Sequence, residues 1–138
     1  MFAEKEYPHK ELTGRIIAAA MKVHSVLGPG YLERIYENAL MRELNNVGLK
    51  AQRQVSCAVD YQGYPVGEHV LDIVIEGKVY VELKCQTLTG LETAQVLSGL
   101  KASRLKVGLL INFNTPHLRN GIRRVVLPQA YLEPKPEG

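Results

Sequence analysis

The chain has 138 residues, of which 46% are hydrophobic and 22% are charged. A chain of this length forms one domain with its own core, and this composition excludes disordered and fibrous proteins. No apolar run approaches the roughly 20 residues of a membrane-spanning helix, and the first residues lack the apolar stretch of a signal peptide. The two cysteines, Cys57 and Cys85, are too few for a disulfide framework. We therefore expect a cytoplasmic protein with reduced thiols and no membrane contact.

The charge is unevenly distributed along the chain. The formal net charge is only +3, but no acidic residue lies between Glu92 and Glu133. The lysines and arginines of that window are Lys101, Arg104, Lys106, Arg119, Arg123 and Arg124. Such asymmetry favours a phosphate-rich partner, and we predict that these residues bind nucleic acid. A solvated face of the protein is the alternative.

Two helices are predicted at the start of the chain, after a flexible N-terminus of residues 1–11. Apolar residues at helical spacing predict the first helix over residues 12–27. The sequence Gly28-Pro29-Gly30 ends it. A second apolar stripe predicts a helix over residues 31–47, and Gly48 stands at the position that favours glycine after a helix.

The hydrophobic period then changes from that of a helix to that of strands. Apolar and polar residues alternate over residues 55–59. Two further strands are predicted over residues 69–75 and 79–85, with turns at Gly63 and Gly77.

The last third of the chain predicts a helix followed by strands. Thr89 with Glu92 three positions later forms a capping box, which predicts a helix that ends near residue 103. Residues 106–113 are almost continuously apolar, as in a central strand. Residues 123–127 add an edge strand or a short helix, and residues 128–138 are expected to be a flexible tail.

Charged residues interrupt the apolar faces of three predicted elements. Glu33 falls within the core-facing arc of the second helix, where a carboxylate is costly unless it is paired, protonated or bound to metal. Asp72 interrupts an apolar strand, and Glu82 and Lys84 share one face of the next strand. Lysine and glutamate are rarely buried unless they are paired, so packing alone does not explain them. For Glu33, an ion pair with an arginine of the sheet is the alternative.

These residues suit the metal-assisted hydrolysis of phosphodiester bonds. Mg²⁺ prefers oxygen ligands, commonly one or two carboxylates completed by water and substrate phosphate. Asp72 and Glu82 would supply the carboxylates, with the Leu83 carbonyl nearby and Glu33 as a further ligand, direct or through water. Lys84 would steady the attacking water or the charge that develops on the phosphoryl group.

A shared metal constrains the turn between the two strands. A two-residue turn at Gly77 and Lys78 would send Asp72 to the face opposite Glu82. We therefore predict a three-residue loop over residues 75–77, with Gly77 at positive φ in a G1 bulge.

Together these residues resemble the PD-(D/E)xK nuclease superfamily, whose restriction-endonuclease-like core has the order α-β-β-β-α-β. The segments Gly30-Tyr-Leu-Glu33-Arg-Ile-Tyr36 and Val81-Glu-Leu-Lys84 further resemble the GxxExxY protein family. The resemblance covers residues 12–127, which we expect to form a single α/β domain. It implies a mixed central sheet flanked by helices, with an extra helix at the N-terminus. The site that it implies consists of Glu33, Asp72, Glu82, Lys84 and, on the following helix, Gln95. Leu71 stands where the proline of the superfamily would precede Asp72.

Three further polar residues are weaker candidates. Gln95 shares a helix face with Gly99, which would let the helix approach the sheet closely, while Val96 lies on the opposite side; a place for Gln95 at the rim is the alternative. His24 would reach the site from the first helix, although such a histidine is more often a satisfied core or rim residue. Tyr36 belongs to the GxxExxY signature, and packing with one hydrogen bond also explains it.

Two functions are compatible with these observations. The first is an Mg²⁺- or Mn²⁺-dependent nuclease, a hydrolase that acts on the phosphodiester bonds of DNA or RNA, and the presence of all the implied site residues favours it. The second is a catalytically silent nuclease fold that binds nucleic acid or a protein partner. The chain has no room for a separate sequence-reading domain, so any specificity would come from a homodimer or another subunit.

Overall fold

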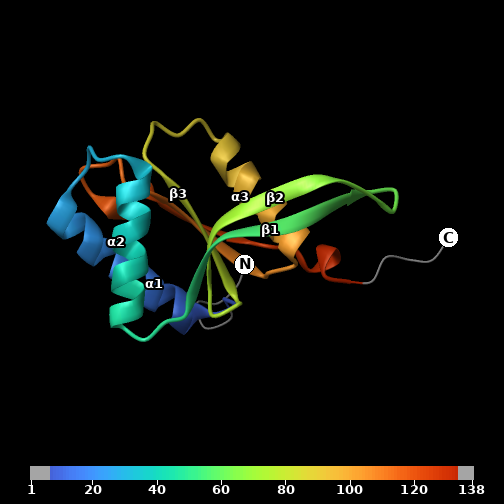
Figure 1. The fold of residues 1–138 in the computed structure, drawn as a ribbon, viewed down its shortest axis with the longest axis horizontal. Coiled ribbons are helices and arrows are strands. Elements are labelled where there is room, and N and C mark those ends of the chain that lie inside the picture. Colours follow the sequence, from blue (N-terminus) through green and yellow to red (C-terminus); the bar gives the residue numbers. More distant parts are fainter. Residues whose placement is uncertain (1–6, 134–138) are drawn as a thin grey trace.

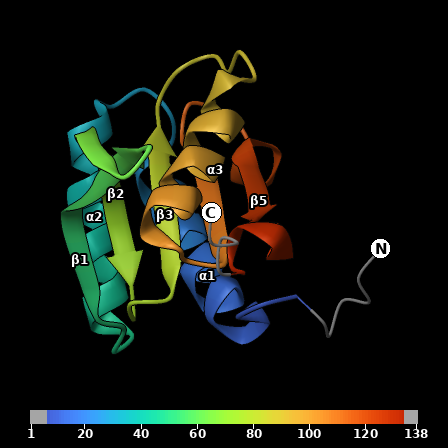
Figure 2. The same ribbon diagram turned by 90° about the vertical axis from the view of Figure 1, so that its right-hand side faces the viewer.

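The computed structural model describes residues 7–133, which form a three-layer α/β fold (Figure 1). Helices α1 and α2 cover one face of a central sheet, and α3 covers the other face (Figure 2). The helices are α1 (Lys10–Leu27), α2 (Glu33–Asn46) and α3 (Leu91–Ser103). The strands are β1 (Ala51–Tyr61), β2 (Tyr64–Ile75), β3 (Val79–Lys84), β4 (Val107–Asn112) and β5 (Ile122–Val126), and the short 3₁₀ helices are η2 (Leu118–Gly121) and η3 (Gln129–Tyr131).

The sheet is mixed, with the strand order β1-β2-β3-β4-β5. Neighbouring strands are antiparallel except for β3 and β4, which are parallel. A parallel pair needs a crossover, and α3 supplies it. This architecture is the expected restriction-endonuclease-like α/β fold with an extra N-terminal helix.

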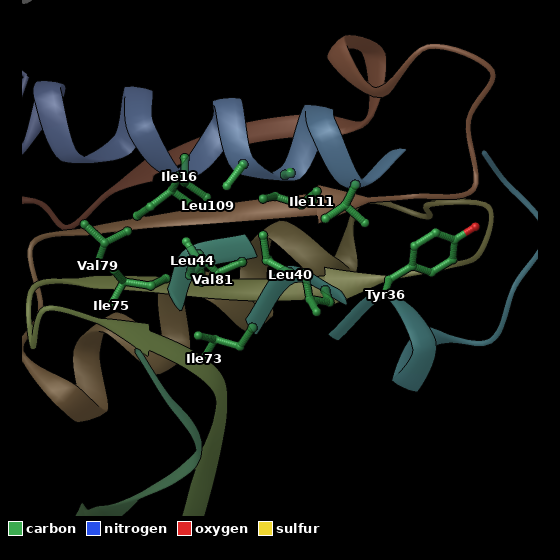
Figure 3. Close-up of a cluster of buried hydrophobic side chains, with 14 of the residues drawn as sticks. Ile16, Tyr36, Leu40, Leu44, Ile73, Ile75, Val79, Val81, Leu109 and Ile111 are labelled. Atoms are coloured by element: carbon green, nitrogen blue, oxygen red, sulfur yellow. The ribbon is translucent and has the colours of Figure 1, made fainter. Parts of the chain in front are cut away.

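The core consists of two apolar clusters, one on each side of the sheet. In the first, Ile16 of α1 and Leu40 of α2 pack on Val81 and Leu109 of the central strands (Figure 3). In the second, Val96 and Leu100 of α3 pack on Leu71, Tyr80 and Leu110. Both faces of β3 and β4 are therefore buried, which explains their nearly continuous apolar sequence.

The observed elements lie close to the predicted ones. Helix α1 begins two residues earlier than expected, and α2 begins two residues later, at Glu33. Strand β2 begins at Tyr64 rather than at residue 69, because it continues as a two-stranded ribbon with β1. Of the two alternatives for the last element, the edge strand β5 is the one observed. No helix within residues 7–133 is long and apolar enough to cross a membrane.

The flexible segments expected at the two ends of the chain lie partly outside the described residues. Residues 1–6 and 134–138 are not described. Within the described part, residues 10 and 11 belong to α1, and η3 lies inside the expected tail. The Arg104 guanidinium donates to the Leu132 carbonyl at 2.9 Å, which ties this part of the tail to the end of α3.

The loop between β2 and β3 has the odd length that the shared site requires. Ile75 pairs with Val79, so the loop is residues 76–78, one residue later than expected. Glu76 and Gly77 both have positive φ, 56° and 64°, and the Lys78 N–H donates to the Ile75 carbonyl at 2.9 Å. Positive φ at both central residues is typical of a type I′ turn, so the expected G1 bulge is wrong in detail. The expected positive φ of Gly77 is confirmed.

The contact between α3 and the sheet depends on Gly99. A Cβ atom at this position would lie 2.5 Å from Cε2 of Tyr80 and 2.9 Å from Cδ2 of Leu71. Both neighbours belong to the buried layer and cannot move freely.

We therefore expect Gly99→Ala to lower the free energy of unfolding by about 1–3 kcal/mol, as overpacking does. Gly14→Ala in α1 is the matched control, because no atom lies within 4 Å of its added Cβ; it should stabilise the protein by about 0.5–1 kcal/mol through helix propensity. Urea unfolding of both variants measures the difference. Equal stabilisation by the two substitutions would contradict the close approach of α3.

Candidate functional site

The candidate site lies where β2 and β3 separate. The two strands pair only from Ile73–Val81 to Ile75–Val79. Beyond this ladder, the Asp72 carboxylate accepts a hydrogen bond from the Leu83 N–H at 2.9 Å. A side chain thus replaces the backbone carbonyl that would have continued the ladder, and the strands form a fork with Asp72 at its base.

The buried side chains of β2 point to different faces of the sheet before and after Asp72. Ile73 belongs to the cluster under α1 and α2, whereas Leu71, two residues away, belongs to the cluster under α3. Residues two apart in a regular strand face the same side, so the strand twists here. Gln54 of β1, which lies between the partners of Ile73 and Leu71, has a φ of 53°. This distortion of both strands turns the Asp72 carboxylate towards β3.

Glu82 lies across the fork from Asp72 and is almost completely buried, with 9% of its surface exposed. Its Oε1 accepts a hydrogen bond from the Tyr80 hydroxyl, and its Oε2 lies 3.4 Å from Nζ of Lys84. Tyr80, Glu82 and Lys84 are two residues apart and therefore share the face of β3 that α3 covers. The structure thus places Asp72, Glu82 and Lys84 together, as the sequence predicts.

The neighbouring charges of the site raise the pKa of two of its acidic residues, Asp72 and Glu33. Burial and the neighbouring Glu82 charge raise the pKa of Asp72 to about 6, against the opposing effect of the Leu83 N–H. Burial and the nearby Asp72 charge also raise the pKa of Glu33, while the Lys84 charge opposes the shift. Burial, together with the hydrogen bond to Glu82, raises the pKa of Tyr80, so its hydroxyl remains a donor.

The Leu83 carbonyl supplies a third oxygen to the fork. The Lys84 carbonyl accepts from the Phe113 N–H at 2.9 Å, on the β4 side of β3. Successive carbonyls of a strand point to opposite edges, so the carbonyl of Leu83 faces the β2 side, where Asp72 lies. Two carboxylates and a carbonyl are hard oxygen donors that suit Mg²⁺ or Mn²⁺. Within residues 7–133 no group of three or more His, Cys, Asp or Glu side chains is close enough to hold a metal ion. A ligand role of Glu33, direct or through water, stays a prediction.

Glu33 differs from the prediction in its burial. We expected it in the core-facing arc of α2, but it is exposed, because it is the first residue of the helix. The alternative, an ion pair with an arginine of the sheet, belongs instead to Glu37, whose Oε2 lies 3.4 Å from Nη1 of Arg53. Glu33 therefore stands at the mouth of the site, within electrostatic range of Asp72 and Lys84.

Tyr36 fixes the segment that leads into α2. Its hydroxyl donates to the Gly28 carbonyl and accepts from the Tyr31 N–H at 3.2 Å. Its ring stacks on Phe113 at a centroid distance of 4.5 Å, and Phe113 is bonded to the Lys84 carbonyl. The tyrosine of the Gly30–Tyr36 segment thus ties the start of α2, and with it Glu33, to the end of β3.

Neither of the remaining single candidates, Gln95 and His24, makes a hydrogen bond to the carboxylates of the site within residues 7–133. Gln95 is exposed, and its amide makes no hydrogen bond within residues 7–133. Gly99 faces the sheet as expected, but so does Val96, so the expectation that Val96 lies on the opposite side of α3 is wrong. His24 is buried with Nε2 at 2.8 Å from the Thr115 carbonyl, which is the satisfied state of a core histidine.

Three of the six basic residues lie at the end of the sheet opposite the carboxylates. Helix α3 starts near the end of β3 and runs back, so Lys101 and Arg104 lie at the far end. There Lys101 Nζ lies 4.6 Å from the centre of the Tyr131 ring. Lys106 directly precedes Val107, which pairs with Val79, so Lys106 lies near Lys78 in the loop before β3. Burial, and then the charges of Lys78 and Lys106, lower the pKa of the nearby His9.

The other three basic residues lie along the β5 edge. Arg123 and Arg124 alternate, so they point to opposite faces of the sheet. Arg124 donates to Thr13 Oγ1 of α1 at 3.1 Å, whereas Arg123 shares its face and its row of the sheet with Glu82, with Leu110 between them. Arg119 belongs to η2, at the same end of the sheet as Lys84. The six residues therefore do not form one continuous surface.

Tyr80 is the site residue that sequence reasoning missed. It shares a face with Glu82 and Lys84, and it holds one oxygen of Glu82. The alternation that groups Glu82 with Lys84 also includes Tyr80, two residues earlier, and a buried tyrosine needs a hydrogen-bond partner. That combination was the available signal.

The comparison with known families agrees with this geometry. The family model described as the PD-(D/E)XK nuclease superfamily matches residues 10–125, which include every element from α1 to β5 except the last residue of β5. The chain therefore belongs to the PD-(D/E)XK nuclease superfamily. No curated protein matches the chain in sequence.

The raised pKa of Asp72 predicts a specific pH dependence of stability. A carboxyl group whose pKa is higher in the folded protein favours folding at low pH, and this contribution is lost as the pH rises through about 6. Asp72→Asn removes the charge and keeps an oxygen that can accept from Leu83. Without metal, we expect the difference in free energy of unfolding between Asp72→Asn and the wild type to rise by about 1–2 kcal/mol in favour of the variant from pH 4 to pH 8, because the partial exposure of Asp72 reduces the effect.

Asp60→Asn is the control for this measurement. Asp60 is exposed on the ribbon and makes no side-chain hydrogen bond or ion pair within residues 7–133. Its substitution should change stability by less than about 0.5 kcal/mol at either pH. Urea unfolding in EDTA measures both variants, and a stability difference for Asp72→Asn that does not depend on pH would contradict the account of the carboxylate pair.

Proposed function

We propose that the protein is a metal-dependent nuclease of the GxxExxY type that hydrolyses phosphodiester bonds in nucleic acid, with Mg²⁺ or Mn²⁺ as its cofactor. One observation carries the proposal: the fork between β2 and β3 gathers the carboxylates of Asp72 and Glu82 around the Leu83 carbonyl, with Lys84 beside them. Two carboxylates that repel each other in a partly buried position are costly, and a divalent cation would remove that cost. When bound, such a cation supplies Lewis-acid polarisation of a phosphoryl oxygen.

The residues around the fork would divide the remaining work. Lys84 Nζ is held 3.4 Å from Glu82 and would donate to the attacking water or to the phosphoryl oxygen on which charge develops. Tyr80 would fix the orientation of Glu82 through its hydroxyl. Glu33, exposed at the start of α2, would hold a water at the mouth of the site, and Gln95 would contact the substrate from α3.

The nucleic acid would approach from the end of the sheet where β3 and β4 finish. Arg119 lies at this end of the sheet, and Arg123 lies on the face that carries Glu82. Both would bind phosphates of the nucleic acid there. Lys101, Arg104 and Lys106 would contact the nucleic acid only if it extended to the far end of the domain. Arg124, which is bonded to Thr13, would contribute mainly to the packing of β5 on α1.

The catalytically silent alternative has one observation in its favour. Both oxygens of Glu82 already have partners, the Tyr80 hydroxyl and the Lys84 ammonium group. A silent protein would keep these contacts, whereas a nuclease must exchange at least one of them for a cation. Metal-dependent cleavage therefore distinguishes the two functions.

The test is cleavage of a panel of single- and double-stranded DNA and RNA in Mg²⁺, Mn²⁺ or EDTA. We expect cleavage by the wild type in metal and none in EDTA. Lys84→Ala should reduce the rate by about 100-fold or more, as the loss of one donor to a developing charge does. Lys78→Ala is the matched control, because this exposed lysine lies in the loop at the other end of β3; it should keep the wild-type rate.

The result that contradicts the proposal is a folded wild type that binds nucleic acid without cleaving it in either metal. Equal cleavage by the wild type and Lys84→Ala would also contradict it, because it would place the activity outside this site.

A further inference from the structure

A pocket of about 460 Å³ lies between the second half of α1 and the segment that follows β4. Met21 and Leu118 form apolar parts of its wall, and His117, Arg119 and Asn120 add nitrogen donors. Its volume lies within the range of roughly 300–1,000 Å³ that is typical of small-ligand sites. The proposed nuclease function uses one of the lining residues, Arg119, as a phosphate contact, but it assigns no ligand to the pocket itself.

The pocket has the charge of an anion-binding site. No acidic residue lines it in the described part of the chain. The side chains of His117, Arg119 and Asn120 make no hydrogen bond or ion pair within residues 7–133, so their donors are available to a ligand. A second guanidinium lies beside the rim, since Nη1 of Arg123 donates to the carbonyls of Asn120 and Ile122, each at 3.0 Å.

The wall that carries these donors is held in place by the fold. The Nε2 atom of His24 lies 2.8 Å from the Thr115 carbonyl, and the Thr115 hydroxyl donates to the His117 carbonyl at 3.0 Å. Gly121 closes the segment against β4, where a Cβ atom would collide with the Asn112 carbonyl. A preformed wall reduces the entropy that a ligand must overcome on binding.

The pocket lies at the same end of the sheet as the carboxylate fork. Asn112, the last residue of β4, pairs with Lys84, and the pocket segment begins directly after it. Phe113 connects the two places, because its N–H is bonded to the Lys84 carbonyl and its ring lies 6.3 Å from that of His24.

We propose that this pocket binds one nucleotide that carries a terminal phosphate, with Arg119, His117 and Asn120 on the phosphate and Met21 and Leu118 against the base or sugar. An arginine fork matches a phosphate through paired, charge-assisted hydrogen bonds. The pocket has the volume of one small ligand rather than of a continuing strand, so it would receive the end of a strand or a free nucleotide. In the first case the inference rests on the proposed nuclease function, and it makes the enzyme sensitive to strand ends.

The test measures binding without cleavage, in EDTA. Fluorescence anisotropy compares a tetrathymidylate that has a 5′-phosphate with one that has a 5′-hydroxyl, and competition compares thymidine 5′-monophosphate with thymidine. We expect the phosphate to tighten binding by roughly tenfold in the wild type, the effect of a charge-assisted hydrogen bond. Arg119→Ala and, separately, His117→Ala should remove most of that preference.

Arg42→Ala is the matched control, because Arg42 is an exposed arginine of α2 that does not line the pocket. It should keep the tenfold preference, and the melting temperature of each variant verifies its fold. A preference for the strand over the free nucleotide identifies a strand end as the ligand, and equal affinity identifies a free nucleotide. A wild type that binds both tetrathymidylates equally, or a folded Arg119→Ala variant that keeps the preference, overturns the inference.

The two proposals fail separately in these experiments. Metal-dependent cleavage that Lys84→Ala abolishes, together with no effect of the terminal phosphate on binding, supports the nuclease function and contradicts nucleotide binding in the pocket. A phosphate preference that depends on Arg119, in a protein that cleaves no nucleic acid, supports nucleotide binding in the pocket and contradicts the nuclease function.

Discussion

The hydrogen bond from the Leu83 N–H to the Asp72 carboxylate holds the point where β2 leaves β3. Because a side chain ends the ladder there, the Leu83 carbonyl is left facing the fork and Glu82 lies across from Asp72. The same twist transfers β2 from the layer under α1 and α2 to the layer under α3, where it continues with β1 as a ribbon. The site and the course of the ribbon thus depend on one local distortion, which Gln54 shares with a φ of 53°.

This arrangement reduces stability in favour of a specific geometry. A carboxylate whose pKa is raised to about 6 weakens the folded state near neutral pH, and the neighbouring Glu82 is buried against Tyr80 and Lys84. Such local conflicts with the rules of a stable core are expected at functional sites. Glu92, at the start of α3, follows those rules instead. Hydrogen bonds from its own backbone N–H and those of Thr89 and Gly90 lower the pKa of Glu92 to about 2, despite partial desolvation, and stabilise the start of α3.

The sequence was most informative where periodicity and chemistry coincide. A site shared by Asp72 and Glu82 required a loop of odd length between their strands, and the observed loop of residues 76–78 confirms that length. The burial of Glu33 was predicted wrongly, because the start of α2 is set by the hydrogen bonds of Tyr36 to the preceding loop, which no periodicity reveals. The basic residues were grouped by their closeness in sequence, but α3 runs back along the sheet and β5 alternates its two arginines between faces. Only the three-dimensional topology separates them.

Anomalous diffraction from a crystal soaked in Mn²⁺ tests the central claim most directly, because it locates the cation without relying on activity. The account predicts a peak between the carboxylates of Asp72 and Glu82, within bonding distance of the Leu83 carbonyl, and no peak there in Glu82→Gln. An ordered fork without a peak at millimolar Mn²⁺, or a peak that persists unchanged in Glu82→Gln, would contradict it.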